Sequence, residues 1–409
     1  MYLLSPSLII NEIATQLHLS ITIINMVIFA NIIVLYVHLS KTISISSNFK
    51  RYLITIFLIQ IYLVMVWVVV YDGNIYGAGP RSFIKVMTLI LFSALIMRSR
   101  QFDIVKFNVL FINIAFLLSL SSIFLYIGYN LDYVSLSWER LEGHYSYMWK
   151  GFGGYLNTIG NAYGTNYGSQ IRSQSFFSEP ANFAQYLTIP LFFALQQFIL
   201  NRNMMSIIKL LTISVALILT FSVANIFGVI FAILLYTVLS SIKNPGKNKV
   251  LNRSIYLIAS ALVVIYSLQL YSSVNDLRGQ TVMAKGTDYY SFFVKIERMG
   301  VYLSEINDHP MGNIEFIDDN KSNPGLIFNI LIIGGYPLFL LFMPIVYSFF
   351  RTMWRSVKYS KYQYLYLGPF AYILPILWEG EIREYYLLFI LILFPIISEM
   401  DKKNETVLL

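Results

Sequence analysis

The sequence predicts an all-α integral membrane protein with about eleven transmembrane helices, a count of 10–12 being compatible with the pattern. Of the 409 residues, 57% are hydrophobic and only 12% are charged, which is about half the charge of a soluble domain. The mean hydropathy is +0.64. The apolar residues also occur in runs near 20 residues long, and helices of that length cross a hydrocarbon core of about 30 Å.

These apolar runs place the spans in one polytopic membrane domain that covers residues 1–409. The expected bounds are 21–39, 52–71, 83–98, 107–127, 183–200, 210–222, 224–241, 254–270, 326–350, 365–378 and 385–399. As one helix, the uncharged stretch from Leu210 to Ile242 would be about 50 Å long, which is too long for one crossing. We therefore expect two short helices there, joined by a tight turn near residues 222–225.

The distribution of charge sets the orientation of these spans. Alternate connections place 18 of the 29 Lys and Arg, but only 4 of the 21 acidic residues, on one side. That side has a net charge of +14, against −6 on the other side, and the positive-inside rule makes it cytoplasmic. The N-terminus is thus expected outside and the C-terminus inside. Because the basic excess reflects topology, no nucleic-acid partner is expected.

Composition removes several classes of function. The chain has no cysteine, which excludes disulfides, thiol nucleophiles and cysteine metal sites. Four scattered histidines do not suggest a histidine-rich metal site, so we predict neither a metal nor a cofactor. The sequence contains no nucleophile elbow, P-loop or zincin motif. It also begins without the pattern of a removable signal peptide, and the fate of residues 1–20 stays open.

Two connections on the outer side are long, residues 128–182 and 271–325. Both are rich in Tyr, Gly, Asn and charged residues. Loops of this length are usually functional or disordered, and their aromatic residues and mixed charges argue against disorder. We expect them to contain short helices and to carry the functional residues.

The first long connection ends in a segment suited to binding an anion. Pro180 fits the first turn of a helix, where its missing N–H costs nothing. The free N–H groups and the dipole of such a helix start favour a bound phosphate. Arg172 can add a bidentate contact to that phosphate, or it can form a salt bridge with Glu179 that only fixes the loop.

Other outward-facing candidates are Arg278, Arg298, His309, Arg383, Glu139 and Glu142. Basic residues that face a leaflet often do no more than meet lipid headgroups. His309 precedes Pro310, and a histidine in that setting is more often a loop-capping residue than a catalyst. Arg383 either meets a phosphate or pairs with a neighbouring glutamate. Tyr145, Tyr147 and Trp149 suit stacking on sugars or an interfacial aromatic belt.

The stretch from Arg172 to Phe183 resembles the R-x-x-S/G-x-F-x-E-P-x-x-F/L segment of bacterial O-antigen polymerases of the Wzy type. Thr220-Phe221-Ser222 is similar to their T-x-S-R turn, with Val223 in place of the arginine. Arg298, Pro310 and Gly312 resemble the family's R…P-x-G segment. Ser322-Asn323 and Gly334-Gly335 resemble its H-N…G segment. Related O-antigen ligases normally keep a histidine at the position of Ser322, which favours a polymerase.

The resemblance implies a metal-independent glycosyltransferase of the bacterial inner membrane, active on the periplasmic face in lipopolysaccharide O-antigen biosynthesis. It would transfer a growing glycan from undecaprenyl pyrophosphate to the non-reducing end of another lipid-linked repeat unit. The catalytic residues would be Arg172, Glu179, Arg298 and His309. The pyrophosphate and glycan would contact Arg278, Arg383, Asn182, Ser322, Asn323, Glu139 and Glu142. Membrane lipid and a chain-length regulator are the other expected partners.

Two alternatives stay open. An O-antigen ligase differs in its deletion phenotype, because loss of a polymerase leaves one repeat on the acceptor and loss of a ligase leaves none. A transporter of polysaccharide or lipid-linked sugars would need polar residues buried within its spans. Lys85 is the one basic residue that we expect inside a span.

Overall fold

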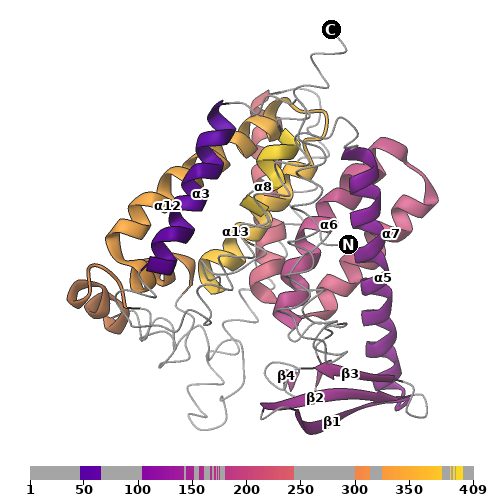
Figure 1. The fold of residues 1–409 in the computed structure, drawn as a ribbon. Coiled ribbons are helices and arrows are strands. Elements are labelled where there is room, and N and C mark those ends of the chain that lie inside the picture. Colours follow the sequence, from indigo (N-terminus) through magenta and orange to yellow (C-terminus); the bar gives the residue numbers. More distant parts are fainter. Residues whose placement is uncertain are drawn as a thin grey trace, which may run out of the picture. The chain divides into compact units, whose positions relative to one another are not determined.

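A computed structural model describes residues 47–65, 104–141, 144–151, 156–160, 166–167, 170–171, 173, 175, 180–243, 300–313, 325–379, 387, 390–391 and 393–398 (Figure 1). Most of these residues are helical, as the sequence predicts. Among these described residues, three helices are long and apolar enough to cross a membrane, namely Lys106–Asn130, Ala181–Asn201 and Leu326–Tyr359. The count of eleven spans and their orientation stay predictions.

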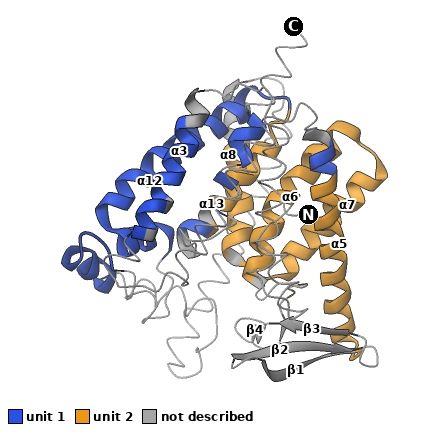
Figure 2. Cartoon of the chain, viewed as in Figure 1, with its two compact units in different colours: residues 1–109, 299–361, 376–409 blue, residues 110–298, 362–375 orange. Residues whose placement is uncertain are grey.

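The chain divides into two compact units, which Figure 2 colours separately. Unit 1 comprises residues 1–109, 299–361 and 376–409. Unit 2 comprises residues 110–298 and 362–375.

In unit 1, α3 (Ser47–Met65) packs against α12 (Leu326–Tyr359), and the two helices lie side by side in Figure 1. The buried face of α3 repeats with helical spacing and consists of Tyr52, Leu53, Ile56, Ile59 and Leu63. The Tyr52 hydroxyl donates to the Leu391 carbonyl at 2.6 Å, and the hydroxyls of Ser356 and Ser398 are hydrogen-bonded at 2.8 Å. These two bonds join α3 and α12 to the C-terminal helical residues.

Unit 2 is built around α6, most of whose residues are buried. Its helices are most of α5 (Ile104–Asn130), then α6 (Pro180–Asn201), α7 (Met204–Leu219), α8 (Val223–Lys243), the 3-10 helix η3 (Leu365–Leu367) and the first part of α13 (Gly368–Glu379). α6 packs against α7, α8 and η3. α8 approaches α13 so closely that a Cβ on Gly228 would lie 2.0 Å from the Ala371 carbonyl oxygen, so this crossing needs a glycine.

Several helix bounds agree with the sequence predictions. α6 begins at Pro180, and α7 and α8 divide the long uncharged stretch in two, as expected. Their turn at residues 220–222 lies slightly before the expected position. α12 extends to Tyr359, beyond the predicted end at residue 350. The predicted spans 21–39, 83–98 and 254–270 lie outside the described residues, and 52–71 and 385–399 are described in part.

The described part of the first long connection contains strands where short helices were expected. β1 (Val134–Leu141), β2 (His144–Gly151) and β3 (Leu156–Gly160) form an antiparallel sheet in that order, and β4 (Asn166–Tyr167) pairs with β5 (Gln170–Ile171). The sequence signal for β1 is an alternation with period two, in which Val134, Leu136 and Trp138 are each followed by a polar residue. Alternation and aromatic residues favour a strand over a helix. In the second connection, residues 300–308 do form a short helix.

Candidate functional site

The first candidate site, in unit 1, is built on a break in α12. Gly335 has a φ of 64° and a ψ of −165°, so α12 consists of two helices that meet at this residue. An L-residue with a side chain rarely adopts this conformation. Pro337 follows and has no N–H to donate back to the preceding turn. Backbone groups on both sides of the break therefore need other partners.

Residues distant in sequence provide those partners. The Asn313 N–H donates to the Ile332 carbonyl at 2.5 Å, and the Tyr336 N–H donates to the Pro310 carbonyl at 3.0 Å. The Tyr62 hydroxyl of α3 donates to the Gly334 carbonyl at 2.8 Å. In a bilayer, non-helical backbone is tolerated where protein or a water-filled cavity surrounds it. The turn at residues 309–313 and α3 together meet that requirement.

Glycines make this approach of two backbones possible. A Cβ on Gly312, whose φ is 102°, would lie 2.5 Å from the Ile333 carbonyl oxygen. A Cβ on Gly335 would lie 2.1 Å from the Pro310 carbonyl oxygen. Both atoms are backbone and cannot move aside as a flexible side chain would. The P-x-G and G-G sequence features, which the sequence alone offers as separate signals, are thus two halves of one contact.

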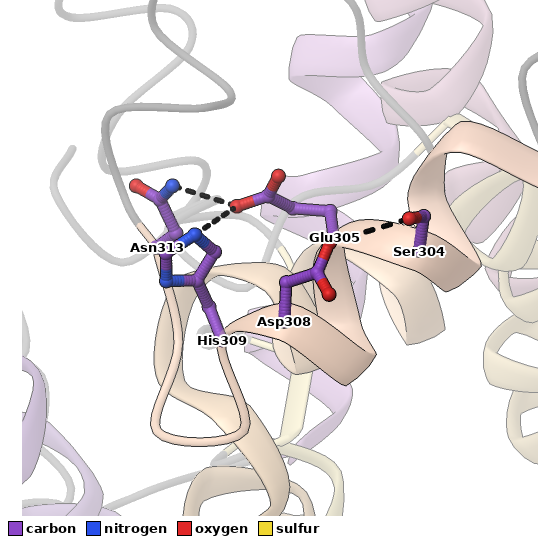
Figure 3. Close-up of polar contacts among 5 residues, drawn as sticks. All are labelled: Ser304, Glu305, Asp308, His309 and Asn313. Atoms are coloured by element: carbon purple, nitrogen blue, oxygen red, sulfur yellow. Dashed lines mark hydrogen bonds and ion pairs between the residues drawn. The ribbon is translucent and has the colours of Figure 1, made fainter.

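A polar cluster lies at the C-terminal end of the 300–308 helix (Figure 3). The Asn313 Nδ2 donates to the Glu305 Oε1 at 2.6 Å, and the His309 Nε2 lies 3.5 Å from the same oxygen. The Glu305 side chain is 15% exposed and that of His309 is 52% exposed. The mostly buried Glu305 carboxylate therefore contacts the Nε2 side of an imidazole that is about half exposed.

A second carboxylate on the same helix end is oriented differently. The Asp308 Oδ2 accepts a hydrogen bond from the Ser304 hydroxyl at 3.3 Å, one turn earlier (Figure 3). Glu305 therefore stands apart as the carboxylate paired with His309. It was not among the residues selected from the sequence. A Glu four residues before a His on a short helix was the available signal, but it needed the 300–308 helix to be predicted first.

The second candidate site, in unit 2, is the segment around Ser173 and Ser175, described on either side of position 174. The Ser173 N–H donates to the Leu219 carbonyl at 2.9 Å, and its hydroxyl donates to the Ser122 carbonyl at 3.1 Å. The hydroxyls of Ser173 and Ser122 are also hydrogen-bonded to each other, as are those of Ser175 and Ser121 at 2.6 Å. These bonds fix the end of the first long connection on α5 and on the end of α7.

The turn that follows Leu219 is closed by buried hydroxyl and amide groups. The Thr220 hydroxyl donates to the Leu217 carbonyl at 2.6 Å and accepts from the Ser222 N–H at 3.2 Å. The Asn225 Nδ2 donates to the Ser222 hydroxyl at 2.8 Å, and the Thr188 hydroxyl donates to the Asn225 Oδ1 at 3.4 Å. Thr220, Asn225 and Thr188 are fully buried. The T-F-S turn is therefore closed by buried groups, and it directly follows Leu219, the acceptor of the Ser173 N–H.

The structure places some of the other predicted site residues. Asn182 lies in the first turn of α6, half-buried, and Glu139 lies in β1 opposite Ser146 of β2. Tyr145, Tyr147 and Trp149 occupy alternate positions of β2. The remaining predicted residues lie outside the described part of the chain, namely Arg172, Glu179, Arg278, Arg298, Ser322, Asn323, Arg383 and Glu142. Among the described residues, no group of three His, Cys, Asp or Glu could hold a metal ion.

Comparison with protein-family models found no match, and comparisons with curated proteins and with solved structures found none either. The resemblance to O-antigen polymerases therefore depends on the motif residues of this chain alone. Contacts between those motif segments occur within each unit, at the α12 break in unit 1 and at the Ser173 segment in unit 2.

Proposed function

We propose that this chain is an O-antigen polymerase of the Wzy type, a glycosyltransferase of the bacterial inner membrane. It would transfer a growing glycan from undecaprenyl pyrophosphate to the non-reducing end of another lipid-linked repeat unit on the periplasmic face. The observation that carries the proposal is the pairing of motif segments that lie apart in the sequence. Segments that match short motifs only by chance are not expected to contact one another in the fold.

One such pair is in each unit. In unit 2, the residue after Arg172 is hydrogen-bonded to Leu219, directly before the T-F-S turn. In unit 1, Gly312 of the P-x-G segment lies against the Gly334–Gly335 break. Four of the short segments that carry the resemblance thus form two contacts, which supports a common function for them.

In the predicted orientation, α12 begins at the outer surface and its break lies in the outer half of the membrane. Gly335 lies nine residues after Leu326, or about 14 Å along the helix. The turn at residues 309–313 is held at that depth by the bonds to Ile332 and Tyr336. A sugar on a pyrophosphate at the headgroup level would therefore have to extend inward between the helices to reach this turn.

The proposed reaction needs charge neutralisation and a base. The acceptor sugar hydroxyl attacks the anomeric carbon of the donor glycan, and the bond from that carbon to the pyrophosphate oxygen breaks. Arg172 and Arg298, with Arg278 and Arg383, would stabilise the negative charge that develops on the pyrophosphate. His309 would accept the hydroxyl proton. The leaving group is already activated, so the reaction needs no nucleotide.

One observation favours a second candidate, a transporter of lipid-linked sugars. Interrupted membrane helices occur at the substrate sites of transporters, and α12 is interrupted. However, α12 carries no charged residue before Arg351, and the described partners of its break are backbone groups and one tyrosine hydroxyl. A passage for a charged lipid-linked sugar would favour ionisable side chains within the span itself, whereas the described ionisable groups near the break, Glu305 and His309, belong to the turn beside it. The polymerase therefore stays the preferred proposal.

The test is deletion of the gene in its host and complementation with variants, followed by gel analysis of surface glycans. Loss of the polymerase should leave single repeats, which wild-type chain extends again to a ladder of long glycans. Arg172→Ala should not restore the ladder, whereas Arg202→Ala, which changes an exposed arginine in the α6–α7 connection, should restore it. Deletion that leaves no repeat on the acceptor would indicate a ligase. Deletion that traps lipid-linked repeats on the cytoplasmic leaflet would indicate a transporter.

A further inference from the structure

We infer that Glu305 is a positioning residue that holds His309 as the general base for the acceptor hydroxyl. This inference rests on the proposed function and adds to it the residue that sets the base. Its starting point is the cluster in Figure 3, where one oxygen of Glu305 contacts both Asn313 and His309.

The side of the imidazole that faces Glu305 decides which nitrogen is reactive. His309 presents Nε2 to the carboxylate, at 3.5 Å from Oε1. A carboxylate at that position favours the proton of the neutral ring on Nε2, as an acceptor beside one ring nitrogen generally does. The lone pair is then on Nδ1, away from Glu305. Because 52% of the His309 side chain is exposed, we expect a sugar hydroxyl to approach the ring from its exposed side.

Asn313 connects this pair to the membrane helix. Its side-chain amide donates to the Glu305 Oε1, and its backbone N–H donates to Ile332 at the break in α12. The carboxylate is therefore held by a residue whose own position is set by the helix break. Glu305 is 15% exposed, so its contact with His309 lies partly out of solvent.

The proposed step transfers one proton and exchanges one bond. As the acceptor oxygen bonds to the anomeric carbon, its proton moves to Nδ1 of His309. The bond between the anomeric carbon and the pyrophosphate oxygen breaks, and undecaprenyl pyrophosphate leaves with the electron pair. The imidazolium formed at His309 is stabilised by the Glu305 carboxylate, and its proton is later released to water. Glu305 itself neither gains nor loses a proton.

The kinetic test uses full-length chain in lipid vesicles with lipid-linked repeat units extracted from a strain that lacks this gene. Glu305→Gln keeps an oxygen that can accept from Asn313 but removes the charge. We expect kcat to fall about 10- to 100-fold with KM within about twofold. The reason is that the carboxylate interacts with the imidazolium, which forms only as the transition state is reached. His309→Gln should reduce kcat about 10²- to 10⁴-fold, the usual contribution of a general base.

Asp308→Asn is the matched control. It removes a carboxylate next to His309 whose described contact is Ser304. It should leave kcat and KM within about twofold of wild type. Equal losses for Glu305→Gln and Asp308→Asn, or a wild-type kcat for Glu305→Gln, would overturn the inference.

A second measurement is independent of polymerase activity. In detergent-solubilised chain labelled with ¹⁵N-histidine, the His309 signals are assigned by their loss in His309→Gln. The neutral ring should carry its proton on Nε2 in wild type and in Asp308→Asn, and should lose that preference in Glu305→Ala. An unchanged tautomer in Glu305→Ala overturns the inference even if the chain polymerises glycans. A chain that shows the tautomer change but makes no polymer overturns the proposed function and leaves the Glu305–His309 pairing intact.

Discussion

The turn between α7 and α8 and the break in α12 interrupt apolar stretches of the chain in different ways. The Thr220–Ser222 turn is closed largely by its neighbours in sequence, through Leu217, Ser222 and Asn225. The α12 break is held by Tyr62 and by residues 310–313, which come from other parts of the chain. One interruption is a local structure and the other depends on tertiary contacts.

This difference has a consequence for function. A turn closed by its own buried hydroxyls is fixed before any substrate arrives and is suited to supporting a loop such as the Ser173 segment. A break held by a separate turn couples the membrane helix to that turn. Since the same turn carries His309 and Asn313, changes at the break should reach the candidate base. Substitutions at the α12 break should therefore have larger effects than substitutions within the α7–α8 turn.

The largest effect is expected for Gly335→Ala. The new Cβ would lie 2.1 Å from the Pro310 carbonyl oxygen, on a residue whose φ is 64°. Strain at positive φ and overpacking each cost about 1–3 kcal/mol, so the free energy of unfolding should fall by about 2–6 kcal/mol. Thermal unfolding in detergent measures the change. Gly300→Ala, where nothing lies within 4 Å of the added Cβ, is the control and should change stability by less than about 0.5 kcal/mol.

A smaller effect is expected for Tyr62→Phe. The change removes the hydroxyl that binds the Gly334 carbonyl at 2.8 Å and leaves that part-buried acceptor without this donor. An unsatisfied buried group costs about 1–3 kcal/mol. Tyr347→Phe, at a residue 67% exposed, should be neutral. Equal thermal stability of the two variants would show that the break does not depend on α3 and would weaken the contrast drawn above.

The sequence predicted the local features well. Period and composition identified α5 and α6, Pro180 marked the start of α6, and the length of an uncharged stretch required the turn between α7 and α8. Each of these signals lies within about 30 consecutive residues. Such local signals are predictable because they depend on hydrogen bonding within a helix and on helix length.

The sequence did not predict the features that depend on distant contacts. The spacing of Glu305 and His309 becomes a signal only once the 300–308 helix is known, and only the fold brings Asn313 to Glu305 and leaves Asp308 with Ser304. The Gly334–Gly335 pair was noticed as a motif, but its role as a break depends on Pro310 and Tyr62. The β1–β2 hairpin was missed for a different reason. Its alternating pattern is short and lies in a connection where length alone suggested loops and short helices.

The smallest effect is expected for Thr220→Val, which keeps the shape of the side chain but removes its hydroxyl. The variant loses the donor to Leu217 and the acceptor for the Ser222 N–H, both within the same turn. The free energy of unfolding should fall by about 1–2 kcal/mol, because the Leu217 carbonyl still accepts the Thr220 backbone N–H. Thr55→Val, which removes an exposed hydroxyl bonded to the carbonyl one turn earlier, is the control and should be near neutral.

Glycan extension at a temperature where both variants are folded should stay near wild type, because the effect of a local interruption ends within its turn. A loss of extension in Thr220→Val without a loss of stability would instead show that this turn communicates with the site as the α12 break is proposed to do.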